Sequence, residues 1–152
     1  MAVEGFRLEQ VLRVARSKEE QAQQQLAQLA AERELAQAQL RALREQEWQQ
    51  LTALRDRGQV GSLDPAEHDQ ARAYLEQLAS WIVERAGQVA AVEDQVSASR
   101  GELLELLRER RSLERLKERQ LAEQAREGER RAQRQADDAT SNRFARRGRE
   151  VS

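Results

Sequence analysis

Apolar residues in the first part of the chain recur at two positions of a seven-residue repeat. They are Leu8, Leu12, Ala15, Ala22, Leu26, Leu29, Ala36, Leu40, Leu43 and Leu54. A heptad repeat of this kind predicts a helix that packs against a second helix in a left-handed coiled coil. Glu19, Arg33, Glu47 and Gln50 interrupt the repeat, so this helix contributes the weaker of two apolar seams.

The second half of the chain has a more regular heptad repeat. Its apolar positions are Leu75, Leu78, Ile82, Val89, Val92, Val96, Leu103, Leu106 and Leu113. Arg85 and Ser99 are the exceptions within this run. The repeat predicts a second long helix whose apolar face needs a facing helix.

A single break separates the two repeats. Residues 7–57 contain no glycine or proline, whereas Gly58, Gly61, Asp64 and Pro65 follow within eight positions. Asp64 suits a helix N-cap, Pro65 the first helical position, and Glu67 the position from which a side chain reaches back to the cap. We therefore predict helix one over about 7–57, a loop over 58–64 and helix two from about 65 to 138.

So short a loop requires the two helices to run antiparallel. The fold class is then all-α: an antiparallel coiled-coil hairpin that forms a single domain over residues 1–152. With Arg57 and Pro65 flanking the loop, the numbers of facing residues add to about 122, which places Leu8 near Glu114. Beyond Lys117 the sequence remains helix-prone but polar, which predicts a helical overhang followed by a flexible tail over 139–152.

The amino-acid composition agrees with a thin apolar seam between helices and indicates the cellular compartment of the protein. Charged residues make up 35% of the chain, aromatic residues 3%, and there are no cysteines. Such a chain has too few large side chains for a thick core, and the absence of cysteine fits a reducing compartment. No stretch approaches the roughly 20 apolar residues of a membrane span, and the start lacks the pattern of a secretory signal. We expect a cytoplasmic protein.

Candidate chemistry is sparse. His68 is the only histidine, and a lone histidine is a poor metal site. Asp137 and Asp138 are adjacent, so on a helix their carboxylates point about 100° apart. Gly58 and Gly61 lack the lysine and hydroxyl residue that complete a P-loop. We predict no enzyme activity, no metal and no cofactor.

Two surfaces are candidates for binding partners. Arginines and lysines between Arg108 and Arg119 alternate with glutamates, which is compatible either with a self-paired, solvated helix face or with a surface for an acidic partner. Arg110 and Lys117 fall where the heptad calls for apolar residues. Tyr74 and Trp81 lie beside the seam, either packed over its edge or exposed as interface anchors.

Segments at both ends of the chain resemble the FliJ family, small coiled-coil proteins of the bacterial flagellar export apparatus. The resemblance rests on Phe6-Arg-Leu-Glu-Gln-Val-Leu-Arg-Val-Ala-Arg-Ser-Lys-Glu-Glu-Gln-Ala22 and on Arg111-Ser-Leu-Glu-Arg-Leu-Lys-Glu-Arg119. An acidic pair, Asp137-Asp138, then precedes the basic residue Arg143, as in the family. The similarity covers nearly the whole chain, including the central break.

This resemblance implies a stalk-like coil that binds the hexameric export ATPase (FliI) and links it to the export gate protein (FlhA) and to export chaperones. The protein would lie at the cytoplasmic face of the inner membrane and serve flagellum biogenesis and motility. The paired end of the coil would enter the ATPase ring. Its candidate residues are Arg7, Arg13, Lys18, Arg108, Arg111, Arg115, Lys117 and Arg119. The candidate export-gate patch is Leu43, Tyr74, Leu78, Trp81 and Arg85.

Three alternatives remain open from the sequence. Injectisome type III secretion uses a related stalk protein, and a generic coil could self-associate as a scaffold. The arginines of the tail, Arg143, Arg146, Arg147 and Arg149, could contact nucleic acid, but the net charge of −1 provides no global field for it. We therefore expect no nucleic-acid partner.

Overall fold

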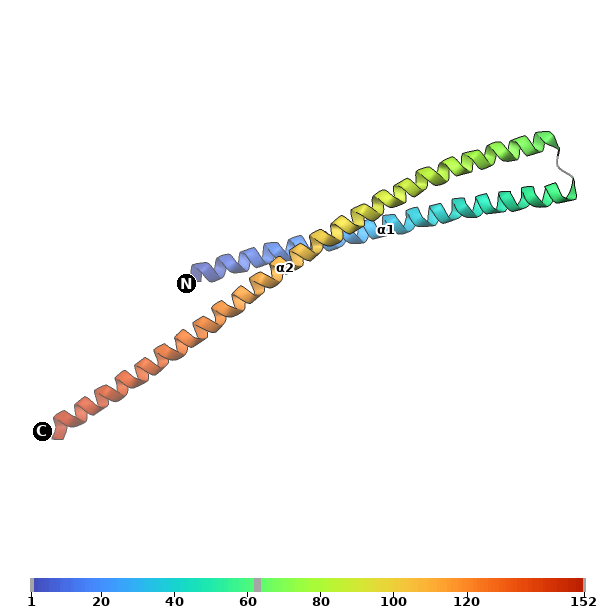
Figure 1. The fold of residues 1–152 in the computed structure, drawn as a ribbon. Helices are drawn as coiled ribbons and strands as arrows, with labels where there is room; N and C mark the ends of the chain where they lie inside the picture. The colour runs from blue at the N-terminus through green and yellow to red at the C-terminus, as the bar shows by residue number, and fades with distance from the viewer. Residues whose placement is uncertain (1, 62–63, 152) are drawn as a thin grey trace. The chain divides into compact units, whose positions relative to one another are not determined.

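The computed structural model describes residues 2–61 and 64–151, which form two long helices. Helix α1 spans Ala2–Val60 and helix α2 spans Pro65–Val151, and the chain reverses direction between them (Figure 1). The predicted all-α antiparallel hairpin is confirmed. Both helices are longer than predicted, and the segment from residue 139, predicted as a flexible tail, is helical as far as Val151.

Local backbone features explain where the helices end and begin. Gly61 directly follows α1 and has a φ of 70°, a left-handed conformation that glycine adopts without a steric penalty and that commonly ends helices. Its N–H donates to the carbonyl of Gly58 at 3.4 Å. The carbonyl of Asp64 accepts the N–H of His68 at 3.0 Å, which makes Asp64 the N-cap residue of α2, as predicted.

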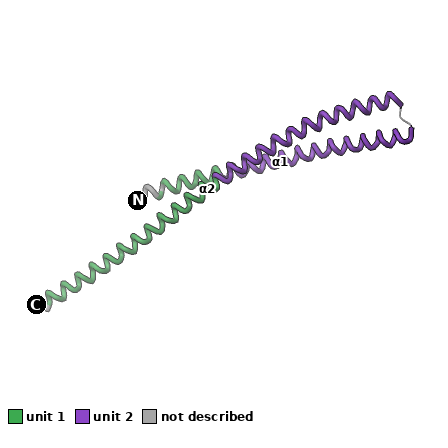
Figure 2. The backbone as a smooth tube through the Cα atoms, in the orientation of Figure 1, with its two compact units in different colours: residues 1–18, 106–152 green, residues 19–105 purple. Residues whose placement is uncertain are grey.

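The chain divides into two compact units, each containing part of both helices (Figure 2). Unit 2 comprises residues 19–105 and contains the loop. Ala36 and Leu40 of α1 pack with Val89 of α2, and Ile82 and Ala86 complete this cluster. Full burial of a leucine, isoleucine or valine side chain stabilises the pairing by about 1.5–3 kcal/mol, so apolar contact across the seam holds unit 2 together.

Unit 1 comprises residues 1–18 and 106–152. On α1, Leu8, Leu12 and Ala15 are buried. On α2 the same seam has two charged positions, Arg110 and Lys117, both half-buried. The pairing in unit 1 therefore combines an apolar row on one helix with a partly charged row on the other.

The facing register of the two helices differs from the prediction. A facing sum of 122 would place Lys117 opposite Gly5, whereas Lys117 forms an ion pair with Glu9 at 2.9 Å. The reason is that α1 ends at Val60 and not at Arg57. Because α1 continues for three residues past Arg57 before the loop, each residue of α2 faces a residue of α1 that lies later in the chain than predicted.

Several charged and polar residues at seam positions of unit 2 are buried or half-buried, whereas Gln50 is exposed. Glu19 and Ser99 are buried, and Arg33 is half-buried. Within the described part of the chain, the Nε atom of Arg33 is buried and has no hydrogen-bond partner. Such a donor costs free energy, so Arg33 is a weak point of the unit 2 seam.

Candidate binding surfaces

The paired end, which we define as residues 7–18 of α1 and 108–119 of α2, carries two groups of ion pairs across unit 1. Lys117 Nζ donates to Glu9 Oε1 at 2.9 Å. Glu114 Oε1 accepts from Arg110 at 2.9 Å and lies 3.6 Å from a guanidinium nitrogen of Arg16. The two charged seam residues of α2 are thus both paired, and both groups join α1 to α2.

These contacts change the acidity of the two glutamates. The hydrogen bond and the charge of Lys117 hold the pKa of Glu9 below its ordinary value of 4.5. The hydrogen bond from Arg110, with a smaller contribution from Arg16, lowers the pKa of Glu114 in the same way. Both carboxylates are therefore ionised at neutral pH, and the ion pairs persist until the solution becomes acidic.

Most of the predicted ATPase-binding cations are exposed on the paired end. The exposed residues are Arg7, Arg13, Lys18, Arg108, Arg111, Arg115 and Arg119. Lys117 differs, because it is half-buried and engaged by Glu9. By heptad position most of these cations lie away from the seam on both helices, so they do not converge on one pocket. Such an arrangement presents positive charge in several directions at once.

The sequence analysis missed an apolar strip beside these cations. Val11 and Val14 are about half exposed, at 48% and 54%. Together with Ala15 and Lys18 of α1 and Glu109 of α2 they line a shallow depression in unit 1. A signal was present in the sequence, because both valines lie outside the two apolar heptad positions, where polar residues are expected.

The second surface is a shallow depression in unit 2, lined by Leu43, Trp81, Glu84 and Arg85. The structure thus brings together three of the five predicted export-gate residues. Arg85 donates to the side-chain oxygens of Gln39 at 2.7 Å and Gln88 at 2.9 Å. These hydrogen bonds hold the guanidinium at the seam edge beside the exposed indole of Trp81.

The other two predicted gate residues have different surroundings. Tyr74 is 39% exposed, close to the 42% of Trp81, seven residues later on α2. Leu78 is 0% exposed. It is a residue of the unit 2 core, and it supports the surface from beneath without being available to a partner. Its inclusion in an exposed patch is therefore a correction, because its heptad position points into the seam.

The candidate catalytic and metal residues remain separate. Among the described residues, no group of three or more histidine, cysteine or acidic side chains is placed to hold a metal ion. His68, Asp137 and Asp138 are each exposed. Over residues 2–61 and 64–151, neither helix has an apolar stretch long enough to cross a membrane.

Comparison with known proteins supplies the family. The family model described as flagellar FliJ protein matches residues 4–149, nearly the whole chain. The chain belongs to the FliJ family. No curated protein and no solved structure matches it.

Membership of the FliJ family makes this chain a protein of flagellar type III export. The matched range contains the paired end, the depression around Trp81 and most of α2 beyond the paired end. The flagellar model favours flagellar export over the injectisome alternative. FliJ proteins are export components with a stalk role and are not known as enzymes.

Proposed function

We propose that this FliJ-family chain is a stalk that binds the flagellar export ATPase (FliI) through the paired end of unit 1. In this role the protein is cytoplasmic and lies at the inner membrane only through the export apparatus. The observation that carries the proposal is the placement of exposed cations on both helices of the paired end. A partner that surrounds the coil, such as a ring, can contact all of them, whereas a flat partner reaches one side.

The apolar strip of Val11 and Val14 supports the same role. Long-range charge attraction speeds association, whereas desolvated apolar contacts slow dissociation. The two valines can make such contacts with a partner, in a depression that Lys18 and Glu109 also line. A binding end that combines exposed valines with surrounding cations is suited to a partner with acidic and apolar surface.

The test is binding of the purified chain to its cognate export ATPase, followed by ATP hydrolysis. We expect binding in the wild type and a loss of at least about tenfold in affinity for Arg111→Glu/Arg115→Glu, since close charge pairs at interfaces have substantial coupling energies. The matched control is Arg44→Glu/Arg55→Glu, which reverses two exposed arginines of unit 2. Equal affinity of the two variants, or no binding by the wild type, would contradict the proposal.

A second contact of the same stalk is proposed for the depression around Trp81. Exposed aromatic residues beside an arginine are typical interface anchors, and Trp81 and Arg85 lie together in this depression. We assign it to the export gate protein (FlhA), with Tyr74 and Leu43 at its border. Export chaperones are further partners that the family suggests, and nothing in this chain favours one surface for them.

The gate assignment is tested by substituting Trp81 with alanine. We expect at least about tenfold weaker binding to the gate protein, since loss of an aromatic anchor costs about 2 kcal/mol or more. Trp48→Ala is the control, because Trp48 is more exposed, at 62%, and does not line the depression. If Trp48→Ala has the larger effect, the gate surface lies elsewhere.

Coupling between the ATPase and the gate follows only if both partners bias one shared equilibrium. The two proposed surfaces lie in different units of the chain. We therefore expect the gate protein to alter the affinity for the ATPase, and the ATPase to alter the affinity for the gate protein by the same factor. Independent affinities would leave the protein as an adaptor without coupling.

A further inference from the structure

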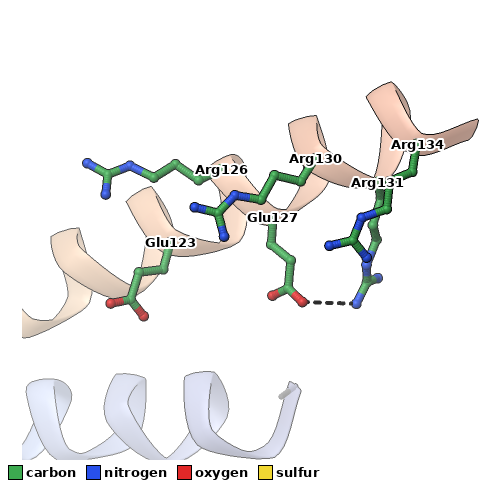
Figure 3. A pocket seen from close by; sticks show the side chains of 6 residues that line it. All are labelled: Glu123, Arg126, Glu127, Arg130, Arg131 and Arg134. Atoms are coloured by element: carbon green, nitrogen blue, oxygen red, sulfur yellow. Dashed lines mark hydrogen bonds and ion pairs between the residues drawn. The ribbon is translucent and has the colours of Figure 1, made fainter. Parts of the chain in front are cut away.

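Beyond the paired end, α2 carries a concave cluster of arginines, which we call the arginine groove. It is lined by Glu123, Arg126, Glu127, Arg130, Arg131 and Arg134 (Figure 3). Arg131 forms an ion pair with Glu127 at 3.4 Å. Within the described residues, Arg126, Arg130 and Arg134 have no ion-pair or hydrogen-bond partner. The groove therefore contains more positive charge than the chain itself neutralises.

One side of the groove continues the face of α2 that packs against α1 in unit 1. Arg134 is three heptads after the seam residue Leu113, and Arg131 is two heptads after Lys117. A depression shared by the two helices reaches from Gly5 of α1 to Gln124 of α2. In Figure 3, Glu127, Arg131 and Arg134 extend toward the side of α2 on which the α1 ribbon lies and ends. A face built to pack a helix thus continues where α1 no longer covers it.

By heptad position Arg134 continues this face, Arg130 lies at its edge and Arg126 lies on the outward side of α2. The charges of these arginines determine which helix could bind beside them. Arg126, Arg130 and Arg134 follow one another at intervals of four residues, the spacing at which side chains share one side of a helix. Glutamates or aspartates spaced by three or four residues on a facing helix would meet them in register. The nearby first turn of α1 adds partial positive charge, as helix N-termini do.

The acidic neighbours of the groove argue against an extended polyanion. Glu123 lines one end, and Asp137 and Asp138 follow its other end. A nucleic acid or a lipid surface would place phosphates against these carboxylates, whereas a short helix can confine its acidic residues to about 12 Å, the length from Arg126 to Arg134 at ~1.5 Å per residue. We propose that the arginine groove binds an acidic α-helix of a partner protein. This proposal does not depend on the ATPase or gate assignments.

The test uses the purified full chain and a fluorescein-labelled, alanine-based peptide with glutamates on one face at spacings of three and four residues. We expect measurable binding by fluorescence anisotropy, and at least about tenfold weaker binding by Arg126→Glu/Arg130→Glu/Arg134→Glu. The matched control is Arg143→Glu/Arg146→Glu/Arg147→Glu, which makes the same charge change at exposed positions of the same helix. It should retain affinity within about twofold.

Two further peptides test whether binding depends on the arrangement and the sign of the charges. A peptide of the same composition with its glutamates scattered around the helix should bind more weakly, and a peptide with lysines on one face should bind the groove triple variant better than the wild type. Equal losses in the two triple variants would overturn the proposal. So would groove-dependent binding of phosphatidylglycerol vesicles or poly-uridine RNA without binding of the acidic peptide. Arg130→Gln/Arg134→Gln, checked by circular dichroism, separates loss of charge from loss of helix.

Discussion

Units 1 and 2 each pack a segment of α1 against a segment of α2, but through different kinds of contact. In unit 2, apolar residues from both helices meet, with Leu40, Leu78 and Val96 among the most buried side chains. In unit 1, the buried row of α1 faces an α2 row that includes Arg110 and Lys117, and the ion pairs Lys117–Glu9 and Arg16–Glu114 join the two helices. Because exposed ion pairs stabilise little, we infer that unit 2 anchors the hairpin, whereas unit 1 opens more readily and is free to bind.

The largest expected effect comes from the core of unit 2. Leu78→Ala should lower the free energy of unfolding by about 2–4 kcal/mol, since it leaves a cavity at a fully buried site. Urea unfolding followed by circular dichroism measures it. Val83→Ala on the same helix is the control, because Val83 is 73% exposed, and it should change stability by less than about 0.5 kcal/mol. Similar losses in both variants would mean that the seam does not anchor unit 2.

A smaller effect of opposite sign is expected at Arg33. Arg33→Leu should raise the free energy of unfolding by about 1 kcal/mol, because it removes a buried Nε donor without a partner and restores an apolar seam position. Arg44→Leu, at an exposed position of the same helix, should leave stability nearly unchanged. A loss of stability in Arg33→Leu would show that the guanidinium makes a contact that unit 2 needs.

Removal of an ion pair should affect unit 1 alone. Lys117→Ala deletes the 2.9 Å contact with Glu9, and hydrogen exchange should increase at residues 7–18 while exchange near Leu40 stays unchanged. High salt should weaken the same contact in the wild type, since it screens exposed charges. The effect on global unfolding should be smaller than that of Arg33→Leu. Faster exchange across both units would show that unit 1 and unit 2 open together.

The smallest expected effect is a response of unit 1 to acid. The pKa values of Glu9 and Glu114 are lowered in the folded chain, so their stabilising contribution is complete above the ordinary value of 4.5 and is lost as the pH falls through the lowered values. A donor–acceptor dye pair across the paired end should report opening in that range. Glu9→Gln/Glu114→Gln should lack this transition, and its persistence there would assign it to other carboxylates.

The heptad repeats and the single break were sufficient to predict the hairpin and the helical overhang. Local patterns determine these features, because an apolar stripe every seven residues has few ways to be buried. The loop and its N-cap at Asp64 follow from backbone preferences that act within a few residues. The outward cations of the paired end were also predictable, since they fall between the apolar positions.

The register and the exposure of individual side chains were not predictable in the same way. A shift of a few residues at the end of α1 changes every facing pair, so the pairing of Lys117 with Glu9 had to come from the structure. The extent to which Leu78 is buried and Val14 is exposed also came from the structure. The heptad assigns each a face, but the amount of cover depends on the residues opposite.

For this chain the sequence alone determined the fold and the family, since the periodic pattern and the end segments are properties of consecutive residues. Only the tertiary structure decided which charged side chains form ion pairs within the protein and which remain available to partners. Lys117 and Arg110 are paired inside unit 1, whereas Arg126, Arg130 and Arg134 are not. The physical reason is that an ion pair requires two side chains within about 4 Å. Spacing along α2 brings Arg110 to Glu114, but only packing across the seam brings Lys117 to Glu9 and Arg16 to Glu114.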